Sequence, residues 1–239
     1  MFVRYRTEAI FLKKLKRFEA DEFLIAYTKE FGKIGVTGKS IRKIKSKLRS
    51  SSELFCYSDI EFVRGKYYNI LTDSELISSF SGIKKELGKS SLAFRMADLL
   101  DSFLAEEERD EHLWTFIVKS FHLLEDLTFK EEKKKRLKLF YYYFSFKFLE
   151  LLGYGLEVGN CSLDKKKKGS VFSPREGGLV CEVCSKSLED PLKVRLTDND
   201  RELLAAIKEN SFEDFLGKKL DFDFIEEAFK NYLALLPSR

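Results

Sequence analysis

The stretch of residues 3–12 reads VRYRTEAIFL, in which polar and apolar side chains alternate. Because successive side chains of a strand point to opposite faces, this alternation predicts a β-strand. Similar short runs follow, separated by Gly32, Gly38 and Gly65 at turn positions. They span residues 23–28, 33–37, 53–63 and 66–71. Five short strands over about 70 residues have the size of a small closed barrel such as an OB-fold, although an SH3-like barrel would give a similar pattern.

From about Ser90 the apolar residues recur every three or four positions, which predicts helices with one buried face. The predicted helices begin near Ser90 and cover residues 111–129, 131–152, 202–208 and 221–235, with N-capping side chains at Thr197, Asp198 and Asn199. Residues 139–148 are almost wholly aromatic and aliphatic, which predicts a central, covered helix. Between Gly153 and Pro191 the periodicity is lost. The chain is therefore predicted to be α+β, with a barrel, a helical part and a loop-rich insert.

Composition favours a folded protein, because 44% of the 239 residues are hydrophobic. Charged residues make up 34% of the chain, yet the net charge is only +4, so the distribution of charge matters more than its sum. The first twelve residues lack the apolar segment of a signal peptide, and nowhere do about 18 apolar residues run together. We expect a cytosolic protein without a membrane span.

Enzyme chemistry finds little support in the sequence. No Ser/His/Asp set, P-loop or dinucleotide fingerprint is present. His112 and His122 are ten residues apart on one predicted helix, about 80° from each other around its axis, so a shared catalytic site is not expected. We therefore predict a binding protein and not an enzyme.

Three of the four cysteines are close in sequence, and in a cytosolic protein this favours a metal site over a disulfide. Cys181 and Cys184 form a C-x2-C turn, and nineteen residues separate Cys181 from Cys161. Asp164 stands where a second such turn would have its last cysteine, so the candidate zinc ligands are Cys161, Asp164, Cys181 and Cys184. The thiolate-rich set indicates a structural site. The alternative is a ribbon that has lost its metal. Cys56 is predicted to be a small buried hydrophobe.

The segment from Lys33 to Arg49 contains seven cations and no acid. These candidate DNA-binding residues are Lys33, Lys39, Arg42, Lys43, Lys45, Lys47 and Arg49. Such a cluster can hold several phosphates, with binding that weakens steeply in salt. The alternatives are a solvated loop without a partner and an adaptor surface for an acidic protein. The lysines at 165–168 are a second run, either a solvated tip or an auxiliary phosphate contact.

Aromatic residues near the basic segment can either stack on bases or lie in the core. They are Tyr57, Phe62, Tyr67 and Tyr68. Because strand residues alternate faces, Tyr67 and Tyr68 are expected to point opposite ways, so at most one of them belongs to a given surface.

The chain resembles the RecO family over most of its length. Residues 27–34 (YTKEFGKI) are similar to the family's first barrel strands, and residues 39–46 (KSIRKIKS) to its basic loop, with Ser40 in place of the usual glycine. The later match is more specific: Leu151, Gly153, Tyr154, Cys161, Phe172, Ser173, Gly177, Gly178, Cys181 and Cys184 occur in the family's order. Asp164 departs from the family's four cysteines, and some members lack the metal.

The resemblance implies an OB-fold DNA-binding domain at residues 1–80 and a helical domain at 81–239 that carries a zinc-ribbon-like insert at 157–190. It implies a cytoplasmic, nucleoid-associated recombination mediator that binds single- and double-stranded DNA and anneals complementary strands. Such proteins act with RecR to load recombinase on DNA coated with single-strand-binding protein, and they contact the acidic C-terminal tail of that coating protein.

Overall fold

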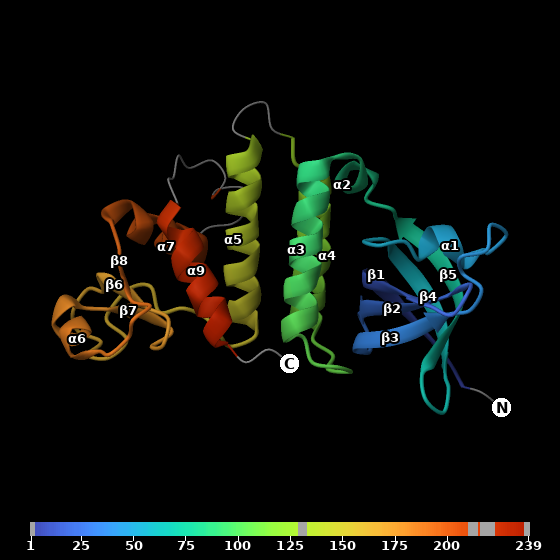
Figure 1. Cartoon of the computed structure of the whole chain (residues 1–239), viewed down its shortest axis with the longest axis horizontal. Helices are drawn as coiled ribbons and strands as arrows, with labels where there is room; N and C mark the ends of the chain where they lie inside the picture. The colour runs from blue at the N-terminus through green and yellow to red at the C-terminus, as the bar shows by residue number, and fades with distance from the viewer. Residues whose placement is uncertain (1–2, 129–132, 210–214, 216–222, 237–239) are drawn as a thin grey trace. The chain divides into compact units, whose positions relative to one another are not determined.

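The structure is a computed structural model that describes residues 3–128, 133–209, 215 and 223–236 (Figure 1). It divides into two compact units, the first ending at Leu137 and the second beginning at Lys138. Among the helices of these described ranges, none is long and apolar enough to cross a membrane.

A closed five-stranded barrel forms the N-terminal part of the first unit (Figure 1). Its strands are β1 (Arg4–Arg17), β2 (Asp21–Thr28), β3 (Gly32–Gly38), β4 (Tyr57–Arg64) and β5 (Asn69–Ser78). Their order around the barrel is β1-β2-β3-β5-β4, with β3 and β5 parallel and the other neighbours antiparallel. The predicted OB-fold type of barrel is confirmed.

Strand β1 closes the barrel because it pairs with two neighbours. Its first part pairs with β4 and its last part with β2, and Ala9 and Ile10 pair with both. A register shift between Phe11 and Lys13 marks an irregularity of the bulge type, which bends a strand. Residues 9–12 are all buried, which explains why alternation gives way there to a continuous apolar run. Helix α3 packs on β1, so this part of the strand is covered on both faces.

Three helices pack with the barrel in the first unit: α2 (Ser81–Lys85), α3 (Leu87–Phe103) and α4 (Glu111–Asp126). The ring of Phe55 lies 4.9 Å from that of Phe94 on α3 and 6.0 Å from that of Phe121 on α4. The predicted domain boundary lies at residue 80, whereas the compact unit extends to Leu137. The difference arises because these helices pack against the outside of the barrel.

The second unit contains helices and a small sheet. Helix α5 (Lys133–Leu151) begins in the first unit and continues into the second, where it is joined by α7 (Asp198–Glu209) and α9 (Asp223–Leu235). The predicted covered helix is confirmed, because Phe140, Tyr142, Phe144 and Phe148 are at most 2% exposed. Thr197 caps α7 as predicted, since its hydroxyl accepts the backbone N–H of Asp200.

The insert is built around a three-stranded sheet in the order β7-β6-β8. The strands are β6 (Val171–Ser173), β7 (Gly178–Val180) and β8 (Val194–Arg195), and the short helix α6 (Glu182–Ser187) follows β7. The sheet extends to Arg195, just beyond the predicted insert at 157–190. Barrel, helices and insert together confirm the α+β fold class.

Candidate nucleic-acid interface and metal centre

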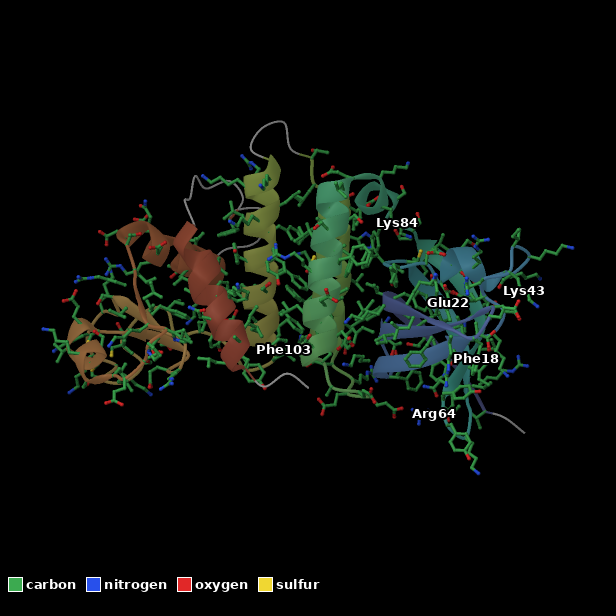
Figure 2. The ribbon with its side chains drawn as sticks, viewed as in Figure 1. Phe18, Glu22, Lys43, Arg64, Lys84 and Phe103 are labelled. Carbon is green, nitrogen blue, oxygen red and sulfur yellow. The ribbon has the colours of Figure 1, made fainter. Side chains whose placement is uncertain are left out.

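The basic loop, residues 39–47, connects β3 to helix α1 (Leu48–Ser51). Six of the seven predicted DNA-binding cations lie on this loop or just after it, and all six are exposed: Lys39, Arg42, Lys43, Lys45, Lys47 and Arg49. Within the described part of the chain, none of the six forms an ion pair with a carboxylate. Figure 2 shows Lys43 on the loop, projecting away from the barrel. The loop therefore carries a concentrated and uncompensated positive charge.

The loop is held in place by apolar and polar contacts. Ile41 is 1% exposed and belongs to the barrel core, against which Leu48 also packs. The backbone N–H of Arg42 donates to the carbonyl of Ala20 at 3.1 Å, and its guanidinium donates to the carbonyl of Glu19 at 2.9 Å. These contacts dock the loop on the turn between β1 and β2, so its cations are presented from a fixed base.

Ser40 occupies the position where the resemblance expects glycine, and its backbone explains that preference. Its φ is 52°, in the left-handed region that glycine adopts without strain. The backbone N–H of Ser40 donates to the carboxylate of Asp21 at 2.7 Å, a bond that does not involve the serine side chain. The turn geometry is therefore formed with serine present.

Lys33 is the predicted DNA-binding residue that the structure separates from the others. It lies in β3, is 8% exposed, and its ammonium donates to the backbone carbonyl of Asp101 at 2.7 Å. The carboxylate of Asp101 lies 3.4 Å from the same nitrogen. Because its charge is buried and paired, Lys33 does not belong to the exposed set. The prediction that groups it with the six exposed cations is wrong. Cys56 is fully buried in the barrel core, as predicted.

The four aromatic residues near the basic segment fall into two groups. Phe62 is fully buried in the barrel core, and the hydroxyl of half-buried Tyr57 bonds to Glu8. Tyr67 and Tyr68 lie in the turn between β4 and β5, not on a strand as the sequence suggested. The alternation argument therefore does not apply, and both line the same hollow.

The predicted metal ligands converge in the insert. One ligand atom from each of Cys161, Asp164, Cys181 and Cys184 lies within 4.8 Å of all the others. Cys161 and Cys181 are buried, whereas Asp164 and Cys184 are partly exposed. The carboxylate of Asp164 takes the place of a fourth thiolate and lies 3.5 Å from the Cys181 sulfur. The cluster can hold a metal ion, and its sulfur-rich donors suit zinc or another thiophilic metal.

Backbone N–H groups lower the pKa of two of the four candidate ligands and so favour their negatively charged forms. The N–H groups of Lys167 and Lys166 each donate to Asp164 at 3.1 Å and lower the pKa of its carboxyl. Burial acts to raise the pKa of Cys161, but backbone N–H groups, that of Asp164 first among them, outweigh it and lower the pKa. The hydrogen bond to Cys181 raises the pKa of Cys184 to about 12. A metal ion must therefore displace a proton from Cys184.

The lysines at 165–168 follow Asp164 directly and are all exposed. The backbone carbonyl of Lys167 accepts the N–H of Cys161 at 2.8 Å, so the run is part of the metal loop itself. Its four side chains are exposed to solvent.

A family model described as Recombination protein O N terminal matches residues 1–80, and one described as Recombination protein O C terminal matches residues 84–233. The DNA repair protein RecO of Dehalococcoides mccartyi is 31% identical over 226 residues, which cover 93% of this chain and 85% of that protein. That of Caldanaerobacter subterraneus is 28% identical over 186 residues, covering 77% and 73%. That of Listeria welshimeri is 26% identical over 200 residues, covering 83% and 75%.

Proposed function

The chain belongs to the RecO family of recombination and DNA repair proteins, and we propose that it is a recombination mediator that binds single- and double-stranded DNA. In this proposal it anneals complementary strands and, with RecR, helps to load recombinase on DNA coated with single-strand-binding protein. The acidic C-terminal tail of that coating protein is a further proposed partner. Its place of action is the nucleoid in the cytoplasm, where such DNA arises.

One observation carries the DNA-binding part of the proposal. The cations of the basic loop are exposed, close together in sequence and without carboxylate partners in the described ranges, while Ile41 and the bonds to residues 19–21 fix the loop's base. A polyanion gains most from such a surface, because each phosphate that is neutralised releases condensed counterions. An acidic protein partner offers a lower and less regular charge density.

Annealing follows from the same electrostatics without a catalytic residue. Two complementary strands repel each other through their phosphates, and a basic surface that screens this repulsion while leaving the bases accessible lowers the barrier to pairing. We therefore propose that the protein is not an enzyme and that its contribution is to bring strands together.

The cysteine cluster is proposed to hold a structural zinc ion. Three thiols and one carboxylate supply four donors, and Cys161, Val171, Val180 and Cys181 form a small core around them. When bound, zinc would cross-link the loop of Cys161 to the turn of Cys181 and Cys184, and so stabilise an insert whose own core is small.

Charge reversal in the basic loop tests the DNA-binding proposal. The variant Lys43→Glu, Lys45→Glu, Lys47→Glu spares Arg42, whose guanidinium docks the loop on Glu19. It should lose binding to single-stranded and duplex DNA and should lose annealing, with an unchanged melting temperature. Fluorescence anisotropy with labelled oligonucleotides at several salt concentrations measures both affinity and its salt dependence. Each lost phosphate contact should reduce the slope of log affinity against log salt by about 0.7 to 0.9.

The matched control carries the same change in net charge elsewhere. Lys85, Lys119 and Lys186 are exposed and lie outside the basic loop. Their reversal to glutamate should leave DNA affinity close to that of the wild type. An unchanged affinity of the loop variant at low salt would refute the role of the loop, and would favour the adaptor that binds an acidic protein.

A further inference from the structure

The turn between β1 and β2 exposes a phenylalanine in an unfavourable backbone conformation. Phe18 is 79% exposed and has a φ of 52°, in the left-handed region that side chains rarely adopt. Both its exposure and its backbone oppose stability, and an asparagine or glycine would suit this turn better. The fold of the turn therefore does not account for a large aromatic ring at this position.

Three aromatic rings lie near the guanidinium of Arg17. The guanidinium carbon lies 4.8 Å from the ring centre of Tyr68, 5.7 Å from that of Phe18 and 6.0 Å from that of Phe23. Arg17 also donates to the hydroxyl of Thr37 at 3.2 Å, which fixes the guanidinium on β3. In the part of the chain that the structure describes, Arg17 has no carboxylate partner. Its charge therefore remains free for an anion.

The turn between β4 and β5 completes this surface. Tyr67 is 82% exposed, Tyr68 is 38% exposed, and the ammonium of Lys66 lies 5.2 Å from the ring centre of Tyr67. Both tyrosines line a hollow with Phe23 and Lys66. Two acids, Glu106 and Glu107, also line the hollow. The carboxylate of Glu107 is paired with Arg64 at 3.3 Å, whereas Glu106 is exposed at the edge away from Arg17 and its three rings. The aromatic surface, defined as Phe18, Tyr67 and Tyr68 with Arg17, thus combines exposed rings with free positive charge.

The aromatic surface borders the basic loop. Arg42 bonds to the carbonyls of Glu19 and Ala20, the two residues that directly follow Phe18. Figure 2 shows Phe18 and Lys43 on the part of the barrel that faces away from α3 and α4. Phe18 therefore lies next to the point where the basic loop is docked on the barrel.

We propose that the aromatic surface stacks on unpaired bases and makes the protein prefer single-stranded to duplex DNA. This inference rests on the proposed function, because it takes the basic loop as the site that holds the sugar-phosphate backbone. Every base has a π face, so stacking on exposed rings is tolerant of sequence. In a duplex those faces are already stacked on their neighbours, so a duplex engages the loop cations but not the rings.

The experiment compares single-stranded and duplex oligonucleotides of equal length by fluorescence anisotropy. Phe18→Leu and Tyr68→Leu keep an apolar side chain but remove the ring. Each should lower single-strand affinity roughly 5- to 100-fold, with duplex affinity within about twofold of wild type. Phe18→Tyr and Tyr68→Phe keep the ring and should retain single-strand affinity. Ile77→Ala, at an exposed apolar position on β5, is the matched control and should have no effect.

Two further readouts separate stacking from charge. The leucine variants should keep the wild-type salt slope, since no phosphate contact is removed. The fluorescence change of 2-aminopurine in the bound strand should be lost with the ring. Equal losses for single strands and duplex, or no loss for either, would overturn the inference. If the charge-reversed loop variant loses binding while both leucine variants bind like wild type, the proposed function stands and the aromatic surface alone is wrong.

Discussion

A single backbone angle at Ser40 leads to a prediction about stability. The left-handed conformation costs a non-glycine residue about 1 kcal/mol, and the bond from its N–H to Asp21 needs no side chain. Ser40→Gly should therefore raise the free energy of unfolding by up to about 1 kcal/mol, partly offset by the greater freedom of glycine in the unfolded chain. Urea unfolding measures it. Ser46 lies in the same loop but has a negative φ, so the control variant Ser46→Gly should not raise the free energy of unfolding. A Ser40→Gly protein less stable than wild type would contradict this account.

Lys33 shows how a cation that belongs to a basic run in sequence can serve the core instead. Removing its partner with Asp101→Ala should destabilise the protein by roughly 3 kcal/mol, because a buried ammonium loses its carboxylate. Lys33→Met should cost less, since Asp101 keeps its ion pair with Lys13 at 2.9 Å. Denaturant melts give both values. The DNA affinity of the Lys33→Met variant should equal that of the wild type. A large loss of DNA affinity in this variant would show that Lys33 does contact DNA.

At the scale of elements, the insert depends on the ligand cluster. If the cluster holds the proposed zinc, a chelator should lower the melting temperature of the protein, because the metal would link two loops around a small core. Asp164→Cys should bind zinc more tightly than wild type, and Asp164→Ala more weakly, since structural zinc sites favour thiolate. Metal analysis and competition with a chromophoric chelator measure the zinc affinity of the three proteins and so rank them. Equal metal affinity in all three proteins would show that Asp164 is not a ligand.

Metal affinity at the same cluster should depend on pH, because its thiols must lose protons to bind a metal ion. Because the pKa of Cys184 is raised to about 12 in the metal-free cluster, binding must displace its proton, and apparent metal affinity should fall as pH falls. The same competition assay at a series of pH values checks the sign. An affinity that rises toward acid pH would contradict thiolate ligation by Cys184.

At the scale of the molecule, the two ends of β3 in the first unit have different surroundings. The segment that follows α3 covers the turn between β2 and β3. Arg109 pairs with Glu30, and Gly32 packs so closely on the backbone of Glu108 that a Cβ would lie 2.1 Å from its carbonyl oxygen. The basic loop follows the opposite end of β3. The net charge of only +4 therefore does not describe the local charge, because one end of β3 leads into a cluster of exposed cations and the other is covered by the segment after α3.

Local sequence patterns were sufficient to predict much of the secondary structure and the cysteine cluster of this protein. The alternation of the barrel strands and the helical period after Ser90 depend on neighbours a few residues apart, and they predicted the correct kinds of element. The spacing of Cys161, Cys181 and Cys184 predicted a cluster that the fold does bring together. Tertiary structure alone decided which cations are free and which rings are exposed. Lys33 is neutralised by Asp101, 68 residues away, and Arg17 brings Phe18 beside Tyr68 from a different turn. The physical reason is that pairing and exposure depend on contacts between distant segments, which periodicity does not encode.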